Sequence, residues 1–455
     1  MIASQRKLFG TDGIRGVAGE FPLSPEGVHA IGYALGHDLG KKGGQARVVI
    51  GQDTRKSSAT IADQLSAGLR SAGCEVHSAG VITTPGVAYL ARSHKFSAGV
   101  VISASHNPWM DNGIKVFSGS GFKLPDAEEL AIEREIFAIL GRAKALPPMA
   151  EMSLPGEAKL REDYINWLAS DVHTDLSGLH ILVDCANGAA AAEAPPLFAK
   201  CGIKAEFIHA GPDGTNINDN CGALHPQTAA KIVADSGGKF DLGVTFDGDA
   251  DRALFSDAHG NVVNGDAILL LTARDMQARG VLQNSTIVAT TMSNMGLEIA
   301  LRDSGIRMLR AGVGDKYVLE EMQKTGAILG GEQSGHIIFR DGEATTGDGL
   351  LTALRVMEVM ARRKMALADL IADLKVFPQV IQNVRVREKV PFAEVAAIQK
   401  TIDDAERELH GNGRVVVRYS GTEALARVMI EAETEEQMNL LAGNIAGAIQ
   451  QNLGL

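Results

Sequence analysis

Short apolar runs that pass into polar loops recur along the chain. The runs begin at Val48, Val100, Ile181, Val244, Ile287 and Ala327. Each enters a loop rich in Gly, Asp and Ser, and helical patterns separate many of them, as at 60–72 and 126–140. This alternation predicts α/β domains with open, mixed but largely parallel sheets covered by helices. Because ligands bind beyond the carboxyl ends of strands in such sheets, we expect the polar loops to face shared clefts.

The pattern also divides the chain. At 455 residues it is too long for one compact core. Prolines at 147, 148 and 155 interrupt helical character, and after Pro378 a new alternation begins, followed by an amphipathic stretch to Leu409 and a closing helix from Glu435. We expect three α/β domains, at 1–155, 156–258 and 259–374, and a smaller C-terminal α+β domain at 375–455, around a central cleft.

Composition narrows the class of partner. Acidic residues number 55 and basic ones 44, and the net charge of −11 argues against binding to nucleic acid or to an anionic membrane. The four cysteines form no C-x-x-C pair, which disfavours a zinc ribbon or a disulfide framework. With no signal peptide and no apolar run of ~18 residues, we expect a cytoplasmic protein. Because the chain is acidic overall, an anionic substrate would need a locally positive cleft.

The loop SASHNP at 103–108 follows the apolar run that ends at Ile102. One interpretation is a hydroxyl-capped turn before Pro108. The other makes Ser105 a nucleophile that carries a phosphoryl group, with His106 and a helix N-terminus or a nest of backbone amides supporting the phosphate. The motif in isolation leaves both open.

The sequence DGDADR, from Asp247, places three carboxylates at the end of another apolar run. A solvated turn is one explanation. A calcium-binding EF-hand is excluded, because Arg252 and Ala258 occupy the positions that need glycine and glutamate. Asp247, Asp249 and Asp251 suit one Mg²⁺, which would neutralise charge on a transferring group. Arg252 either reinforces this electrostatic support or pairs with the aspartates.

Two further loops carry candidate binding groups. In GGEQSGH, Glu332 and Ser334 are two residues apart, so in an extended segment both face one side and suit vicinal sugar hydroxyls. Loop capping is the alternative there, and we assign His336 a structural role. RYSGTE follows a strand-like run and offers a phosphate pocket or a plain turn. Its place in a separate terminal domain favours a lid that closes over the substrate. The pocket residues would be Arg418, Ser420, Gly421 and Thr422.

Motifs for dinucleotide, P-loop, hydrolase-elbow and zincin sites are absent from the sequence. The motifs that are present, FGTDGIRG from Phe9, SASHNP, DNGIK ending at Lys115, DGDADR, GEQSGH and RYSGTE, occur in the order found in the α-D-phosphohexomutase superfamily. The chain resembles that superfamily from residue 9 to its last helix.

The resemblance implies four domains around a central cleft and roles for the candidate residues. Ser105 would be the phosphoserine, its phosphate and the three aspartates would hold Mg²⁺, and Arg15, Lys115 and His106 would assist at the reacting oxygen. Glu332 and Ser334 would select sugar hydroxyls, and the RYSGTE residues would bind the phosphate that is not being transferred. The sequence departs from the family at Ala424, where proline is usual, and at Gly312, where a basic residue is common.

The implied reaction interconverts glucosamine 6-phosphate and glucosamine 1-phosphate through glucosamine 1,6-bisphosphate, for cell-wall precursors. Phosphorylated Ser105 would donate to O1, and the 6-phosphate would return to Ser105. Glucose or mannose phosphates are the alternative substrates. A phosphomonoesterase built on the same serine and metal, and a noncatalytic sugar-phosphate sensor, are further alternatives. The expected partner is a small sugar phosphate, and a homodimer is left open.

Overall fold

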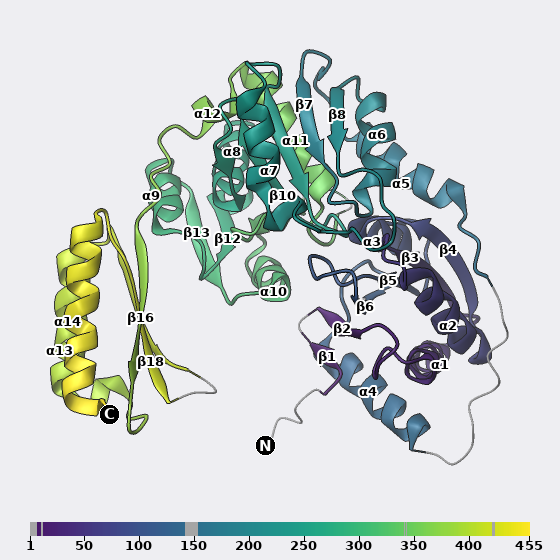
Figure 1. Cartoon of the computed structure of the whole chain (residues 1–455), viewed down its shortest axis with the longest axis horizontal. Coiled ribbons are helices and arrows are strands. Elements are labelled where there is room, and N and C mark those ends of the chain that lie inside the picture. Colours follow the sequence, from purple (N-terminus) through teal and green to yellow (C-terminus); the bar gives the residue numbers. More distant parts are fainter. Residues whose placement is uncertain (1–6, 11, 142–152, 341, 343, 421–423) are drawn as a thin grey trace. The chain divides into compact units, whose positions relative to one another are not determined.

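The computed structural model describes the chain except residues 1–6, 11, 142–152, 341, 343 and 421–423 (Figure 1). Contacts divide it into two compact units. The main unit comprises residues 1–291 and 309–372, and the C-terminal unit comprises 292–308 and 373–455. Each unit is described by itself.

The first sheet of the main unit has the strand order β1-β2-β6-β5-β3-β4. Its strands are β1 (Phe9–Gly10), β2 (Gly13–Val17), β3 (Arg47–Gln52), β4 (Glu75–Val81), β5 (Ala98–Ile102) and β6 (Asp111–Ser118). Strand β3 pairs in parallel with β4 and β5, whereas β6, β2 and β1 extend the sheet with antiparallel pairs. This extension brings Arg15 opposite Gly113 and Lys115 opposite Val101.

Helices cover both faces of this sheet. They are α1 (Pro25–Lys41), α2 (Ser58–Ser71), α3 (Thr84–Ser93) and α4 (Asp126–Leu140). Residues of α1, α2 and α4 share one core with alternate strand residues, whereas Cβ atoms added at Gly51 or Gly99 would meet Val87 of α3. Helix α3 therefore packs on the opposite face. Helices α1 and α2 approach closely, because a Cβ on Gly32 would lie 2.3 Å from the Leu65 carbonyl oxygen.

The second sheet has the order β11-β10-β9-β7-β8, with a parallel centre and an antiparallel edge. Its elements are α5 (Ala158–Ser170), β7 (His180–Asp184), α6 (Ala190–Lys200), β8 (Lys204–Ile208), α7 (Pro226–Asp235), β9 (Leu242–Phe246), β10 (Ala253–Asp257) and β11 (Val262–Val263). Strand β9 is buried throughout, as the apolar run from Val244 predicts.

The third sheet has the order β13-β12-β14-β15. The elements around it are α8 (Gly265–Ala278), β12 (Thr286–Thr290), β13 (Arg307–Ala311), α10 (Asp315–Thr325), β14 (Leu329–Gly331), β15 (Ile337–Phe339), α11 (Gly349–Arg363) and α12 (Leu367–Leu370). Strand β12 pairs in parallel with β14, and β15 adds an antiparallel edge.

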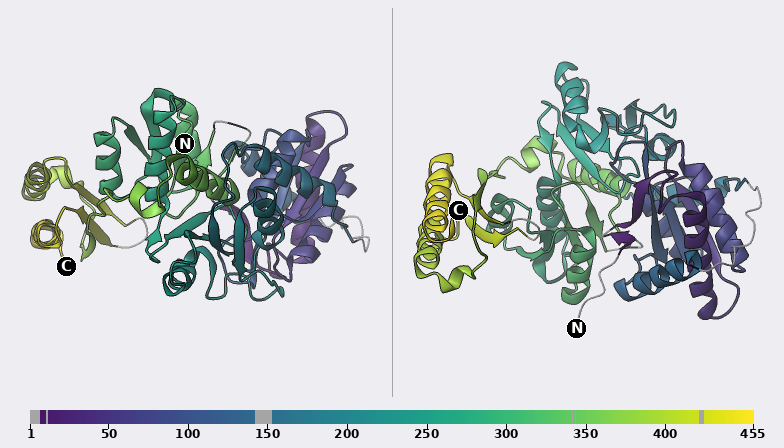
Figure 2. Two further views of the ribbon diagram at one scale, coloured as in Figure 1. Left: turned by 90° about the horizontal axis from the view of Figure 1, so that it is seen from above. Right: turned by 60° about the horizontal axis from the view of Figure 1, so that its bottom comes forward.

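The C-terminal unit holds a three-stranded antiparallel sheet, ordered β16-β18-β17. Its elements are α9 (Met295–Asp303), β16 (Gln379–Arg385), α13 (Ala396–Leu409), β17 (Arg414–Tyr419), β18 (Leu425–Glu431) and α14 (Glu435–Leu453). Helices α13 and α14 lie side by side next to the sheet, and both contribute to its apolar core (Figures 1 and 2). Asn294 joins α9 to this unit, because its side chain exchanges two 2.9 Å hydrogen bonds with the Phe377 backbone.

The predicted fold class is confirmed: three α/β sheets and a smaller C-terminal α+β unit. Every predicted apolar run contains a strand, the helix expected at 126–140 has those bounds, and α2 begins two residues before the expected start. The predicted domain boundaries stay predictions. Among the described residues, no helix combines the length and the apolarity needed to cross a bilayer.

Glu193 of α6 is a fully buried acid. Its Oε2 accepts a 3.3 Å hydrogen bond from the Thr83 backbone, and its Oε1 has no hydrogen-bond partner. Burial raises the pKa of Glu193 to about 8. The folded protein therefore keeps a proton on Glu193 up to about pH 8, whereas the unfolded chain releases it above about pH 4.3.

Stability is consequently expected to fall as pH rises through that window, by up to about 1.4 kcal/mol per pH unit from this group. The change Glu193→Gln keeps the shape without the ionisation, so its unfolding free energy should decline less between pH 5 and 8 and exceed that of the wild type at pH 8. Urea unfolding across this range measures both. The exposed Glu162 of α5 gives the matched control, Glu162→Gln. Parallel pH profiles for wild type and Glu193→Gln would contradict the assignment.

Candidate active site

Ser105 lies just beyond the carboxyl end of β5 and is 1% exposed. Its N–H donates to Ser103 Oγ at 2.9 Å, while its own Oγ donates to Asp247 Oδ2 at 2.6 Å and lies 3.2 Å from His106 Nδ1. The loop therefore has both features: a turn capped by the Ser103 hydroxyl, and a Ser105 hydroxyl that points at a carboxylate. Ser105 has a φ of 54°, in the left-handed region that non-glycine residues rarely adopt.

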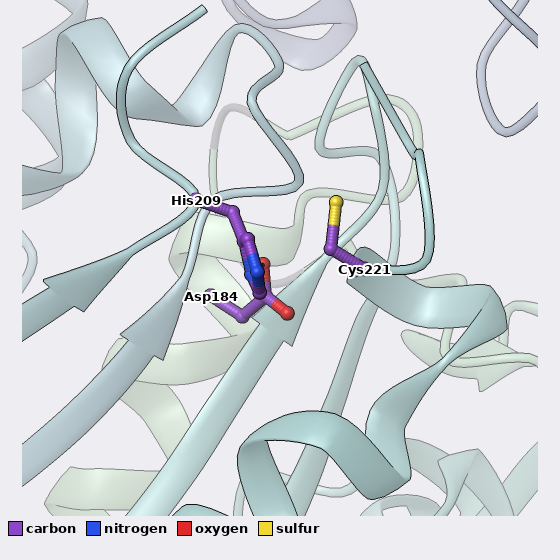
Figure 3. A group of neighbouring side chains, drawn as sticks. All are labelled: Asp184, His209 and Cys221. Atoms are coloured by element: carbon purple, nitrogen blue, oxygen red, sulfur yellow. Dashed lines mark ion pairs between the residues drawn. The ribbon is translucent and has the colours of Figure 1, made fainter. Parts of the chain in front are cut away.

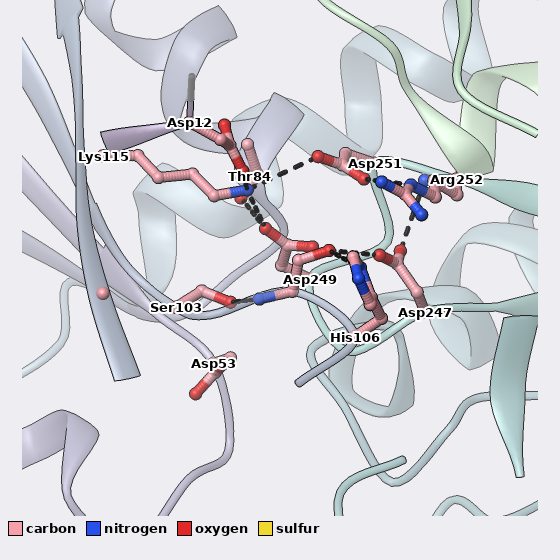
Figure 4. A network of polar contacts seen from close by, with 12 residues as sticks. Asp12, Asp53, Thr84, Ser103, His106, Lys115, Asp247, Asp249, Asp251 and Arg252 are labelled. Atoms are coloured by element: carbon pink, nitrogen blue, oxygen red, sulfur yellow. Dashed lines mark hydrogen bonds and ion pairs between the residues drawn. The ribbon is translucent and has the colours of Figure 1, made fainter. Parts of the chain in front are cut away.

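The three aspartates of DGDADR converge after β9. Asp247, Asp249 and Asp251 are buried, and they offer carboxylate oxygens that lie within 4.8 Å of one another (Figure 4). Burial, and then the charges of Asp251 and Asp249, raise the pKa of Asp247 to about 8. The buried Oδ1 atoms of Asp249 and Asp251 have no hydrogen-bond partner. Converging oxygens with unused acceptor capacity fit a hard divalent cation such as Mg²⁺.

Lys115 supplies a positive charge beside the aspartates. Its Nζ lies 2.7 Å from Asp249, 2.9 Å from Asp12 and 3.5 Å from Asp251 (Figure 4). Burial opposes the charge of Lys115, yet these carboxylates raise its pKa well above the usual value. Arg15 lies close by, with its guanidinium 2.5 Å from Asp12 and donating to Asn107 Oδ1 at 3.3 Å. The structure thus places both predicted cationic helpers beside the serine loop.

Arg252 and two histidines complete this surface. The Arg252 backbone N–H donates to Asp247 at 3.3 Å, and its Nε lies 3.9 Å from Asp251, which is the ion pair considered from the sequence. Burial, reinforced by Arg252 and Arg15, lowers the pKa of His106 and favours its neutral form. His336, to which the sequence interpretation gave a structural role, lies 3.6 Å from Asp251. Burial opposes its protonation, but Asp251 and Asp315 raise the pKa of His336 to about 9.

A cavity of about 400 Å³ opens beside these groups. Its described lining comes from segments next to all three sheets of the main unit: Leu8, Gly10, Asp12, Gly13, Arg15, His106, Asp251, Arg252, Gly314, Asp315, Glu332 and His336. Both signs of charge line it, so the acidic chain still presents cations to an anionic ligand.

Glu332 and Ser334 do not lie in an extended segment. The Gly335 N–H donates to the Glu332 carbonyl at 3.0 Å, and Gly335 has a φ of 93°, so this segment is a tight turn. The expected extended conformation was therefore wrong for this segment. Glu332 lines the cavity and accepts from the Gly314 N–H at 3.0 Å, whereas Ser334 is exposed and is not among the described lining residues.

The RYSGTE residues belong to the C-terminal unit. Arg418 is exposed on β17 opposite Arg427, and Ser420 is buried, with its carbonyl accepting from Lys389 Nζ at 2.6 Å. Gly421 and Thr422 lie outside the described residues. The phosphate-binding role of this loop therefore stays a prediction.

Several site residues escaped the sequence interpretation. Thr84 donates to Asp249 Oδ2 at 2.5 Å, and Lys123 bridges Asp12 at 2.7 Å and Asp315 at 2.6 Å. Burial would raise the pKa of Asp12, but Lys115, Lys123 and Arg15 hold it well below the usual value. Asp12 stands inside the motif FGTDGIRG, which could have drawn attention to it. Thr84 and Lys123 carry no comparable local signal.

A second group of potential ligands lies in the second sheet, where Asp184, His209 and Cys221 come together (Figure 3). The two carboxylate oxygens of Asp184 already accept hydrogen bonds from the backbone of Ala186, at 2.9 Å, and of Gly222, at 3.1 Å. His209 Nδ1 lies 3.1 Å from the same carboxylate, and burial raises the pKa of the Cys221 thiol to about 12. We assign Asp184 the structural role of joining the loops that follow β7 and precede α7.

Comparisons with known proteins cover nearly the whole chain. Models of phosphoglucomutase/phosphomannomutase alpha/beta/alpha domains I, II and III match residues 6–142, 162–260 and 264–377, and the model of the C-terminal domain of that family matches 382–448. A protein of Koribacter versatilis named phosphoglucosamine mutase is 64% identical over 99% of this chain and 98% of its own length. A protein of the same name from Solibacter usitatus is 51% identical over 99% of each chain.

Solved structures agree with the fold. A phosphoglucomutase/phosphomannomutase family protein from Burkholderia thailandensis superposes with a TM-score of 0.78 at 24% identity, over 98% of this chain and 99% of that one. N-acetylphosphoglucosamine mutase from Aspergillus fumigatus gives 0.63 at 18% identity, over 99% and 96%. Because all four domains of one family follow one another along the chain, and close relatives match nearly its full length, the chain belongs to the phosphoglucomutase/phosphomannomutase family.

Proposed function

We propose that the chain interconverts glucosamine 6-phosphate and glucosamine 1-phosphate, with Ser105 as the residue that carries the phosphoryl group. The observation that carries the proposal is the 2.6 Å hydrogen bond from Ser105 Oγ to Asp247, within a buried acidic trio beside a cavity of about 400 Å³. The names of the relatives from Koribacter versatilis and Solibacter usitatus support the amino sugar as substrate.

Each transfer in this proposal moves one phosphoryl group between an alcohol and Ser105. Phosphorylated Ser105 passes its group to O1 of glucosamine 6-phosphate, so that an O1–P bond forms as the Oγ–P bond breaks. The bisphosphate then reorients in the cavity, so that its 6-phosphate faces Ser105. Oγ attacks this phosphate, the O6–P bond breaks, and glucosamine 1-phosphate is left. The proton lost by the attacking Ser105 hydroxyl needs a nearby acceptor. The neutral His106, whose Nδ1 lies 3.2 Å from Oγ, is the candidate, because Asp247 is proposed as a ligand of Mg²⁺.

Fixed charges surround the reacting group. Asp247, Asp249, Asp251 and the seryl phosphate would hold one Mg²⁺, which, when bound, neutralises charge on the phosphoryl group. Lys115 and Arg15 would face the developing charge on the oxygens from the side of Asp12. Arg252 would orient the trio through its backbone N–H to Asp247.

The cavity lining favours an amino sugar. Glucosamine phosphate carries a cationic amine and an anionic phosphate, and the lining offers Asp315 and Glu332 as well as Arg15 and Arg252. Glu332 and Ser334 would contact the sugar. Arg418, Ser420, Gly421 and Thr422 would hold the distal phosphate. The proposal also includes four domains, at 1–155, 156–258, 259–374 and 375–455, and a cytoplasmic location. A homodimer stays open.

Steady-state kinetics test the substrate. We expect kcat/KM for glucosamine 6-phosphate to exceed the values for glucose and mannose 6-phosphates by at least about tenfold, since one pocket contact discriminates by this order. Glu332→Gln should lower the ratio of kcat/KM for glucosamine 6-phosphate to kcat/KM for the other two sugars, because it removes one negative charge proposed to face the amine. Release of inorganic phosphate in step with substrate loss would instead identify a phosphomonoesterase, and faster turnover of glucose or mannose phosphates would reject the amino sugar.

A further inference from the structure

We propose that Arg55 and Asn218 are positioning residues that clamp the backbone carbonyl of Ser105 and so hold its hydroxyl against the acidic trio. The inference rests on the proposed role of Ser105 in phosphoryl transfer. Neither residue carries a chemical motif of its own, and neither is among the described residues that line the cavity.

Arg55 lies just beyond β3 and is 2% exposed. Its guanidinium donates to the carbonyl oxygens of Ser105 at 2.8 Å and Asn107 at 2.9 Å, and also to that of Pro108. Its Nε donates to Asp53 at 2.8 Å, with both side chains fully buried. A planar guanidinium held at one edge by a carboxylate presents its remaining donors in a fixed direction, so the serine loop is fixed with it.

Asp53 is itself fixed. Its Oδ1 accepts from the Arg55 backbone N–H at 3.0 Å and from Ser58 Oγ at 2.7 Å, and Ser58 is the first residue of α2. The carboxylate therefore has partners on both oxygens. The clamp is anchored to the end of β3 and the start of α2, which both belong to the first sheet layer.

Asn218 reaches the same carbonyl from the second sheet layer. Its Nδ2 donates to the Ser105 carbonyl at 2.9 Å and to that of Asn107 at 3.2 Å, while its backbone N–H donates to the Ala186 carbonyl at 2.9 Å. Gly248, between the first two aspartates of the trio, packs against this point. A Cβ there would lie 2.5 Å from the Ser105 carbonyl oxygen and 2.9 Å from Asn218 Nδ2.

The clamp acts on the least favourable backbone position of the loop. A left-handed φ is unfavourable for a non-glycine residue, and two donors on the Ser105 carbonyl offset that cost. Without them, the peptide can relax to an ordinary φ, which swings Oγ away from Asp247. A displacement of about 1 Å in a reacting group lowers turnover by on the order of 10²-fold.

Two variants and a matched control test the clamp. Arg55→Lys keeps the charge beside Asp53 but lacks the planar fork, and Asn218→Asp replaces the donor with an acceptor at a residue type that tolerates its φ of 59°. Arg362→Met is the control, because it removes an arginine that lies 2.9 Å from the buried Asp275. Arg362 is far from the serine loop in sequence, and none of its described contacts reaches that loop. We expect kcat for glucosamine 6-phosphate to fall by about 10–100-fold in the first two variants, with KM within about twofold. The control should keep both constants.

Thermal unfolding of each variant checks the fold, and intact mass after incubation with glucosamine 1,6-bisphosphate reports how fast Ser105 accepts a phosphoryl group. Slower phosphorylation in folded Arg55→Lys and Asn218→Asp supports the clamp. Folded variants that keep wild-type kcat and phosphorylation rate overturn it while leaving the proposed function intact. A wild-type protein that neither turns over sugar phosphates nor accepts the phosphoryl group overturns the proposed function and the clamp together.

Discussion

Replacing Ser105 with alanine is expected to lower mutase turnover by about 10⁴-fold or more, because it removes the only atom proposed to carry the phosphoryl group. The remaining site keeps its charges. Alanine accepts the left-handed backbone no worse than serine, and the variant loses only the hydrogen bonds of Oγ to Asp247 and His106, so the fold should survive. A coupled assay of glucosamine 1-phosphate formation measures the loss.

Intact mass supplies the companion readout. Wild type should gain the mass of one phosphoryl group from glucosamine 1,6-bisphosphate, and Ser105→Ala should gain none. Ser170→Ala on α5, where an exposed serine bonds only the Trp167 carbonyl among described contacts, serves as the control and should behave as wild type. Turnover of Ser105→Ala within about tenfold of wild type would reject covalent catalysis by this residue.

Lys115→Met is expected to cost both stability and activity. The change leaves Asp249, Asp12 and Asp251 with one cation fewer at 2.7, 2.9 and 3.5 Å, inside a site where Lys115 is 2% exposed. Breaking a buried ion pair by removing one partner costs about 3–5 kcal/mol. If Lys115 has its proposed role beside the transferring phosphoryl group, the loss of its charge should also lower kcat by about 10²–10³-fold.

Urea unfolding and steady-state kinetics measure the two effects. Lys159→Met is the matched control, because its Nζ lies 3.4 Å from Asp163 while its side chain is 82% exposed, and surface pairs of this kind contribute at most about 1 kcal/mol. Equal unfolding free energies for wild type and Lys115→Met would mean that the carboxylates do not depend on this cation.

Local pattern was enough to find the buried strands that lead into the candidate chemical loops. Buried strands such as β5 and β9 appear as apolar runs because both faces of a covered sheet exclude water. Ser105 and the three aspartates were found because each group lies within a few residues of a strand end, where ligands bind in α/β sheets. Their spacing, and the order of the motifs, identified the family before any distance was known.

The partners of those groups were decided only by tertiary structure. Lys115 and Asp249 are 134 positions apart, Ser105 and Asp247 are 142 apart, and Arg55 and Ser105 are 50 apart. Such contacts depend on strand order and register, which the antiparallel extension of β6 and β2 sets and which single-residue patterns do not encode. The turn at Glu332 likewise escaped local reading, because a glycine with positive φ redirects a chain whose side-chain spacing is compatible with a strand. Sequence thus identified the candidate side chains for the chemistry; the packing of distant segments determined which of them meet.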